Sequence, residues 1–116
     1  HILDSAQLVP HLPRKPQQIL DVGSGAGLPG LVLAILAPQH HYTLAEKVGK
    51  KAKFMEQAAQ HLKLNNVTIW PKQVAELKQR YDLITCRAWA ALAYRHHHPP
   101  SSRPARCMVV AQGRGS

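Results

Sequence analysis

Short apolar runs alternate with longer amphipathic segments along the first 90 or so residues. Runs of four to six residues, typical of buried strands, span 18–22, 41–45, 67–70 and 81–86. Segments with helix-like patterns lie between them, at 28–37, 50–64 and 74–80. Strands that alternate with helices in this order predict an α/β fold, a Rossmann-like parallel doubly wound sheet.

Proline and asparagine residues mark several boundaries of these elements. A further helix is predicted over residues 1–12, where Pro10 and Pro13 stop it, and Pro38 closes the helix over 28–37. The helix over 50–64 is the clearest, and Asn65-Asn66 ends it. Its predicted buried side carries Ala52, Met55, Ala59 and Leu62.

The pattern stops near residue 92. Residues 94–106 have no apolar period, and their three prolines exclude a central strand there. One short apolar run follows, over 107–111. We therefore predict two parts: a core over 1–92, and a basic Pro/His/Arg-rich tail over 93–116 that is disordered or poorly packed.

The composition is that of one globular domain outside the membrane. The chain has 116 residues, 45% of them hydrophobic, and no apolar run nears the roughly 20 residues that a membrane span needs. No secretory signal is recognisable, and the two cysteines lack CxxC spacing, so we expect the protein in the reducing cytoplasm. We also expect it to be a monomer. The chain begins with His rather than Met, which suggests that the true start is missing.

The net charge of +9 favours a polyanionic partner such as nucleic acid. Almost half of it, +4, lies in residues 93–116. A charge that serves only solubility is the alternative, so charge alone supports a nucleic-acid partner weakly.

A glycine-rich segment follows the first predicted strand, with the sequence Asp21-Val22-Gly23-Ser24-Gly25-Ala26-Gly27. Gly23 permits a tight turn off the strand, while Gly25 and Gly27 remove side chains where a ligand approaches the backbone. The spacing is GxGxG rather than the GxGxxG of dinucleotide enzymes, which better suits the methionine part and ribose of S-adenosylmethionine (SAM). The cofactor-binding residues predicted in this segment are Asp21, Gly23, Ser24, Gly25, Gly27 and Leu28.

Polar residues also stand at the ends of the second and fourth predicted strands. Glu46, 23 residues after Gly23, can accept hydrogen bonds from both ribose hydroxyls and would repel a 2′-phosphate. Lys50 and Lys51 are candidates for RNA phosphates, and Arg87 lies where doubly wound sheets place functional groups. Each feature alone has an ordinary structural explanation, but together they favour a cofactor site.

Catalytic and metal motifs are weak by comparison. His96-His97-His98 has no scaffold that would present a tetrahedral set, so no metal is predicted. No Ser/His/Asp, Cys/His or paired-carboxylate arrangement stands out, and no catalytic residue is predicted.

Four segments together resemble the RsmG family, also called GidB. They are His1-Ile2-Leu3-Asp4-Ser5, the glycine-rich segment extended by Leu28-Pro29-Gly30, Glu46-Lys47-Val48-Gly49-Lys50-Lys51, and Arg87-Ala88-Trp89-Ala90. The resemblance covers about residues 1–92. It implies a bacterial cytoplasmic enzyme that uses SAM to methylate N7 of a guanine in small-subunit ribosomal RNA, with the RNA or the 30S subunit as partner.

The resemblance also implies roles for individual residues. Gly23 and Leu28 would lie in the SAM loop, Glu46 would hold the ribose, and Val74-Ala75 would lie beside the adenine. Arg87 would line the cofactor and RNA side of the pocket. The family usually has an acidic residue where Ala75 stands, a role that Glu76 would have to fill.

The tail departs from the family pattern, and we hypothesise a frameshift near residues 92–94. Read one nucleotide later, the codons of Cys107-Met108-Val109 encode Trp, and those of Ala111-Gln112-Gly113 allow the family's Leu-Lys-Gly. Sequencing the gene tests this hypothesis. The alternatives to an active enzyme are a truncated, inactive methyltransferase fragment and a SAM- or nucleotide-binding module without catalysis.

Overall fold

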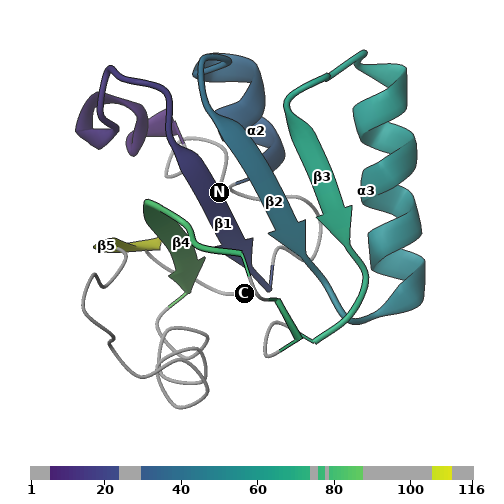
Figure 1. Cartoon of the computed structure of the whole chain (residues 1–116). Coiled ribbons are helices and arrows are strands. Elements are labelled where there is room, and N and C mark those ends of the chain that lie inside the picture. Colours follow the sequence, from purple (N-terminus) through teal and green to yellow (C-terminus); the bar gives the residue numbers. More distant parts are fainter. Residues whose placement is uncertain (1–5, 24–29, 74–75, 78, 88–105, 111–116) are drawn as a thin grey trace, which may run out of the picture.

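A computed structural model describes residues 6–23, 30–73, 76–77, 79–87 and 106–110 of the chain (Figure 1). In these residues a parallel sheet is the central element, and its strand order is β3-β2-β1-β4-β5. Every pair of neighbouring strands runs parallel. The strands are β1 (Gln18–Val22), β2 (His41–Ala45), β3 (Val67–Trp70), β4 (Leu83–Arg87) and β5 (Arg106–Val110).

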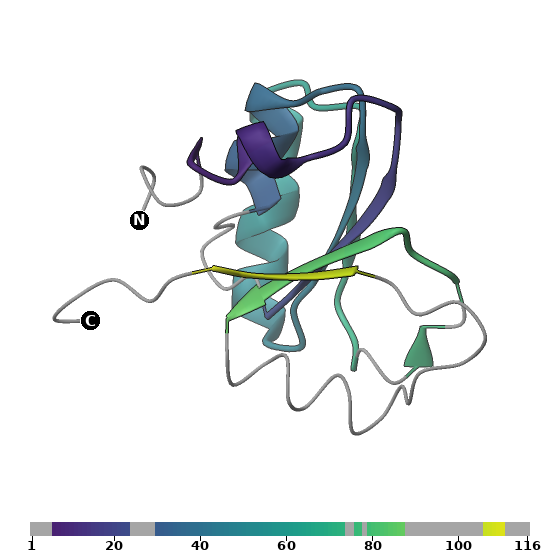
Figure 2. The same cartoon turned by 90° about the vertical axis from the view of Figure 1, so that its left-hand side faces the viewer.

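The helical elements lie together on one face of the sheet (Figure 2). They are the 3₁₀ turn η1 (Val9–His11) and the helices α2 (Gly30–Leu36) and α3 (Gly49–His61). Helix α2 connects β1 to β2, and α3 connects β2 to β3. Because each helix runs back across the sheet between parallel strands, the first three strands form two βαβ units.

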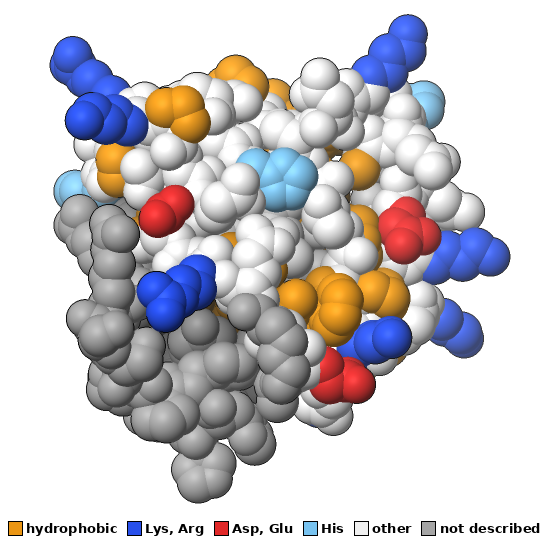
Figure 3. Space-filling model, viewed as in Figure 1, with side chains coloured by type: hydrophobic (Ala, Val, Ile, Leu, Met, Phe, Trp, Pro, Cys, Tyr) orange, Lys and Arg blue, Asp and Glu red, His pale blue; other side chains and the backbone are white. Residues whose placement is uncertain are grey.

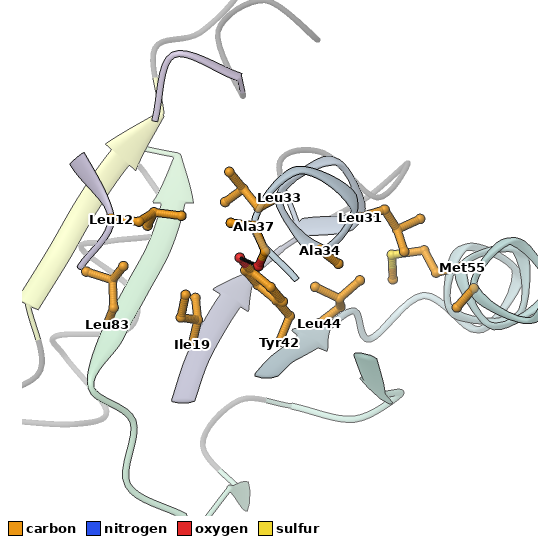
Figure 4. Close-up of a cluster of buried hydrophobic side chains, with 11 residues drawn as sticks. Leu12, Ile19, Leu31, Leu33, Ala34, Ala37, Tyr42, Leu44, Met55 and Leu83 are labelled. Carbon is orange, nitrogen blue, oxygen red and sulfur yellow. Dashed lines mark hydrogen bonds between the residues drawn. The ribbon is translucent and has the colours of Figure 1, made fainter. Parts of the chain in front are cut away.

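The main hydrophobic core lies between these helices and the sheet (Figure 4). Ile19, Tyr42 and Leu44 point from the strands toward Leu33 of α2 and are fully buried. Met55, also fully buried, comes from α3. The Tyr42 hydroxyl donates a hydrogen bond of 2.9 Å to the carbonyl of Ala37, which ties the sheet to the end of α2.

A smaller cluster lies on the other face of the sheet, as expected from the alternation of side chains along a strand. It consists of Leu20, Val22, Ala45, Tyr81, Ile84 and Cys86, with Trp70 and Leu77 packed against it. Apolar residues on both faces of β1 and β4 are therefore buried, as expected for strands near the middle of a parallel sheet.

The strand predictions are confirmed with small shifts. Strands β1, β2 and β3 have the predicted bounds, whereas β4 spans 83–87 rather than 81–86. In the described part of the chain, no helix is long and apolar enough to cross a membrane.

The helix predictions need more correction. Residues 9–11 form only a 3₁₀ turn, because Pro10 cannot support a continuous α-helix, and residues 1–5 lie outside the described ranges. The described residues within 74–80 are not α-helical, since Glu76 lies in a 3₁₀ turn and its described neighbours are irregular. Leu62, expected in the core, follows the end of α3 and is 49% exposed.

The tail also differs from expectation over five residues. The tail over 93–116, predicted to be disordered or poorly packed, contains β5. This strand pairs with β4 from Leu83↔Arg106 to Arg87↔Val110. The prediction is therefore wrong for 106–110, where an apolar run completes the ladder beside β4. The rest of 93–116 lies outside the described residues.

Candidate functional site

The candidate site lies at the carboxyl edge of the sheet, where the parallel strands end. From β1 the chain proceeds through β2 to β3 on one side, while β4 and β5 lie on the other side of β1. The strand order thus reverses between β1 and β4. Doubly wound sheets bind their ligands beside the carboxyl ends of the strands at such a reversal.

Asp21 is the buried acid at this point of the sheet. Its side chain is completely buried near the end of β1. One carboxylate oxygen, Oδ2, accepts a hydrogen bond of 3.0 Å from the backbone N–H of Gly30, where α2 begins. The other, Oδ1, accepts one of 2.8 Å from the hydroxyl of Thr85 in β4. Both oxygens therefore accept hydrogen bonds from the protein, and Asp21 links the start of α2 to β4. The direct cofactor contact of Asp21 stays a prediction.

Gly30 leaves no room for a side chain. A Cβ at this position would lie 2.6 Å from Oδ2 of Asp21 and would overlap the side chain of Leu44. The close approach of α2 to β1 and β2 therefore requires glycine here, and this approach brings the Gly30 N–H within reach of the Asp21 carboxylate.

Gly23 makes the turn that the sequence predicted. Its φ of 67° lies in the left-handed region, which glycine adopts without steric cost. Its N–H donates to the carbonyl of Ala45 at 3.0 Å, so the turn is fixed against the end of β2.

Glu46 follows β2 directly and lies beside this turn. The side chain is 7% exposed, and its Oε1 accepts a hydrogen bond of 3.1 Å from the N–H of Val48. Its own N–H donates to the carbonyl of Trp70 at 2.9 Å. The carboxylate is thus held at the end of β2, one residue after the carbonyl that binds Gly23.

Exposed lysines surround this end of β2 and β3. Lys47, Lys50 and Lys51 precede or open α3, and Lys72 follows β3. The Lys72 ammonium lies 5.7 Å from the centre of the Trp70 ring, and the Trp70 indole N–H donates to the carbonyl of Gln73 at 2.9 Å. The first turn of α3 contains no acidic residue, although acids there would stabilise the helix. The positive charges of Lys50 and Lys51 in this first turn therefore do not stabilise α3 through its dipole.

Several predicted site residues cannot be placed in this geometry. Arg87 is the last residue of β4, as its position in the sequence indicated, but its side chain is not described. In the described ranges, no group of three or more His, Cys, Asp or Glu residues could hold a metal ion. The residues discussed in the sequence analysis as site or metal candidates that lie outside those ranges are Ser24, Gly25, Gly27, Leu28, Val74, Ala75 and the run His96-His97-His98.

No role was predicted from the sequence for Thr85, nor for the fact that glycine has no side chain at position 30. Thr85 is a fully buried hydroxyl residue among the apolar side chains of β4, and in the register of the sheet it lies directly beside Asp21. A polar residue inside an apolar strand was the available signal, but its partner is 64 residues away in the sequence.

Comparison with known protein families agrees with this arrangement. Residues 1–101 match the family model GidB, described as rRNA small subunit methyltransferase G. The chain belongs to the GidB family.

Individual members of the GidB family are also similar to this chain in sequence. The ribosomal RNA small subunit methyltransferase G of Burkholderia multivorans is 45% identical over 100 residues, which cover 80% of this chain and 44% of that protein. The protein of the same name from Coxiella burnetii is 46% identical over 90 residues, covering 76% of this chain and 43% of its own length. The chain thus spans less than half the length of these relatives.

Solved structures support the fold. The coclaurine N-methyltransferase bound to N-methylheliamine and SAH superimposes with a TM-score of 0.68 at 19% identity, over 76% of this chain and 27% of that one. The Rossmann-like methyltransferase fold predicted from the sequence is therefore confirmed for this member of the GidB family.

Proposed function

We propose that this chain binds SAM at the carboxyl edge of its sheet, as the cofactor-binding part of an enzyme that methylates N7 of a guanine in small-subunit ribosomal RNA. The observation that carries the proposal is the pairing of two features at neighbouring strand ends. The left-handed turn at Gly23 binds the carbonyl of Ala45, and the buried carboxylate of Glu46 is the next residue along the chain.

The residues at this edge fit a nucleoside with two free ribose hydroxyls. A carboxylate accepts hydrogen bonds and cannot donate them, so Glu46 suits a diol and disfavours a phosphate. The hydrogen bond from the Val48 N–H restricts the orientation of this carboxylate before any ligand arrives, which reduces the cost of ordering on binding. SAM, when bound, supplies an electrophilic methyl group.

Exposed lysines beside the site fit a nucleic-acid substrate. Lys50 and Lys51 lie in the first turn of α3, close to the end of β2 that carries Glu46. On the face shown in Figure 3, basic side chains are spread over the surface rather than gathered in one patch. The RNA part of the proposal therefore rests on these lysines and on family membership rather than on net charge. The predicted RNA contact of Arg87 remains part of the proposal.

Guanine N7 is a suitable methyl acceptor for a site that binds and orients its substrate but provides no general base. N7 carries a lone pair and no proton, so the transfer requires alignment with the methyl group rather than removal of a proton. In our proposal the protein contributes binding and orientation, and no residue acts as a general base. The cytoplasmic location and the monomeric state belong to the same proposal, as does a division of the chain near residue 92 from which β5, paired with β4, is excepted.

Titration calorimetry with SAM tests the cofactor site. We expect saturable binding by the chain and none by Gly25→Asp, because this substitution places a side chain and a negative charge against the ligand. Unchanged affinity of the variant would refute the assignment of the glycine-rich segment.

A methyl-transfer assay separates an enzyme from a binding module. The chain spans 44% of its relative from Burkholderia multivorans, so methyl transfer is tested separately from SAM binding. Labelled SAM is incubated with 30S subunits or deproteinised ribosomal RNA, and the modified base is identified. Transfer to guanine N7 supports the enzyme, whereas SAM binding without transfer supports the module.

The lysines are tested by the salt dependence of RNA binding. For the double variant Lys50→Ala/Lys51→Ala we expect weaker binding and a shallower salt dependence, because fewer counterions are released from the phosphates. A matched control is Lys63→Ala, in an exposed residue after α3. Equal behaviour of both variants would remove Lys50 and Lys51 from the proposed interface.

A further inference from the structure

The hydrogen bond between Thr85 and Asp21 crosses the sheet at the point where the strand order reverses. Asp21 and Thr85 are paired in the register of β1 and β4, and both side chains are completely buried. The Thr85 hydroxyl donates to Oδ1 of Asp21 at 2.8 Å. A short, fully buried hydrogen bond to a carboxylate is stronger than one between neutral groups.

The same carboxylate fixes one border of residues 24–29, a segment that contains Gly25 and Gly27. Its Oδ2 accepts from the N–H of Gly30, the residue that follows this segment. The other border, Gly23, is bound through its N–H to the carbonyl of Ala45. Both ends of the segment are therefore attached to the sheet, one through a backbone carbonyl and one through the Asp21 side chain.

The orientation of the Asp21 carboxylate determines where Gly30 is held. A carboxylate bound through one oxygen can turn about its last torsion angle, which is broad for aspartate. Bound at both oxygens, by Thr85 and by Gly30, it has one orientation. The backbone of Gly30 packs closely against this carboxylate, because a Cβ at Gly30 would lie 2.6 Å from Oδ2 of Asp21.

We propose that Thr85 is a positioning residue of the cofactor site: its hydroxyl fixes the Asp21 carboxylate, which in turn holds Gly30 and so one border of the segment 24–29. Thr85 itself does not touch the cofactor. The inference rests on the proposed function, because it assumes that the segment binds SAM.

A hydroxyl at this position is otherwise unfavourable. The neighbours of Thr85 in β4 are apolar, and valine has the same shape and a similar preference for strands. Burying a hydroxyl costs free energy unless it makes a hydrogen bond, and the bond it makes is to Asp21. The alternative is that this bond only satisfies a buried acid and so contributes to stability alone.

The test compares two variants that each remove one buried hydroxyl. Thr85→Val deletes the hydrogen bond to Asp21 with little change of shape. Tyr42→Phe deletes the hydrogen bond to Ala37, which lies in the main core beyond the end of α2. For each variant the SAM dissociation constant is measured by calorimetry and the midpoint of unfolding by urea titration.

We expect Thr85→Val to weaken SAM binding by roughly 5- to 10-fold and Tyr42→Phe to leave it within about 2-fold, although both variants unfold more readily. Thr85→Ser retains the hydroxyl and should restore most of the affinity. If Thr85→Val and Tyr42→Phe bind SAM equally well, or if Thr85→Ser binds no better than Thr85→Val, the positioning role is refuted.

Amide hydrogen exchange gives a readout that does not require SAM. The Gly30 N–H should exchange faster in Thr85→Val than in the parent chain, beyond any change shared by the core amides, whereas Tyr42→Phe should show no such local change. Failure of the parent chain to bind SAM would refute the proposed function. An unchanged Gly30 amide in Thr85→Val would refute the role of Thr85 in holding this border.

Discussion

Polar side chains at the amino and carboxyl edges of the parallel sheet hold the two ends of α2, and they do so with opposite chemistry. At the amino edge, where the strands begin, Asn66 and Tyr42 donate to backbone carbonyls in α2 or in the loop that follows it. The amide of Asn66 donates to the carbonyls of Ala34 and His40, at 3.2 and 3.1 Å. The hydroxyl of Tyr42 donates to that of Ala37.

At the carboxyl edge, two carboxylates accept from backbone N–H groups. Asp21 accepts from Gly30 at the start of α2, and Glu46 accepts from Val48, just before α3. The difference follows from the connections between parallel strands. Helices run opposite to the strands, so their unpaired carbonyls gather at the amino edge and their unpaired N–H groups at the carboxyl edge.

The comparison explains why the site lies where it does. The carboxyl edge holds two fixed carboxylates beside the turn at Gly23, whereas the amino edge uses its polar groups to join the loops that enter the strands. Substitutions at the carboxyl edge should therefore change ligand affinity, and those at the amino edge should change stability alone.

The largest effect is expected for Gly30→Ala. The added methyl group would contact the Asp21 carboxylate and overlap Leu44, so the start of α2 must move. We expect a loss of about 1–3 kcal/mol in the free energy of unfolding and the loss of SAM binding. Urea titration and calorimetry measure the two effects.

The matched control for this substitution is Gly49→Ala at the start of α3. No atom lies within 4 Å of a Cβ built at Gly49, so alanine fits there and should stabilise the helix by up to about 1 kcal/mol. Equal stability of the two variants would show that the packing around Gly30 does not require glycine.

Glu46→Gln is the next strongest change at the carboxyl edge. The amide oxygen still accepts from Val48, but the negative charge is lost and one acceptor becomes a donor. We expect SAM affinity to fall roughly 10- to 100-fold with a small change in stability, as measured by calorimetry and thermal unfolding. The exposed Glu56→Gln serves as control. A Glu46→Gln variant that binds SAM as tightly as this control would exclude Glu46 from the ribose site.

Asn66→Ala tests the amino edge. It removes the donors that hold the end of α2 to the loop before β2, so we expect a loss of about 1–2 kcal/mol in stability. SAM affinity of the folded protein should not change. The neighbouring exposed Asn65→Ala should affect neither quantity. A drop in SAM affinity specific to Asn66→Ala would show that the two edges are coupled.

The smallest effect concerns pH and His40. This side chain is buried, and its Nδ1 accepts a hydrogen bond of 3.0 Å from the N–H of Gln17. Burial lowers the pKa of His40 below its ordinary value of 6.5, since the charged form is poorly solvated there and both ring nitrogens of that form are donors. The folded state thus favours the neutral ring.

A group with a lowered pKa in the folded state contributes its full stability above the unfolded value and loses it as the pH falls through the folded one. Stability should therefore decrease below about pH 6.5. His40→Asn, which retains an acceptor, should reduce this dependence, and the exposed His61→Asn should not. Thermal unfolding at about pH 7.5 and about pH 5.5 compares them. An equal pH dependence in both variants would contradict the assignment.

Much of the fold was predictable because its signals are local. Apolar runs of four or five residues, bounded by Pro38, Asn65-Asn66 and the glycine-rich segment, defined β1, β2 and β3 within their observed bounds. Of the candidate site, Gly23 and Glu46 were recognisable, because a glycine after a strand and an acid after the next strand are both short-range patterns. The helices predicted over 1–12 and 74–80 are contradicted at the described residues 7–12, 76–77 and 79–80, since short segments with prolines or few apolar residues depend on their surroundings.

The sequence by itself determined the alternation of strands and helices, the turn at Gly23 and the membership in a methyltransferase family. Tertiary structure decided what is distant along the chain: β5 beside β4, the reversal of strand order between β1 and β4, and the bond from Thr85 to Asp21. The reason is physical. Local backbone preferences act over a few residues, whereas a buried carboxylate is satisfied by whichever donor the sheet register brings to it, here one 64 residues away.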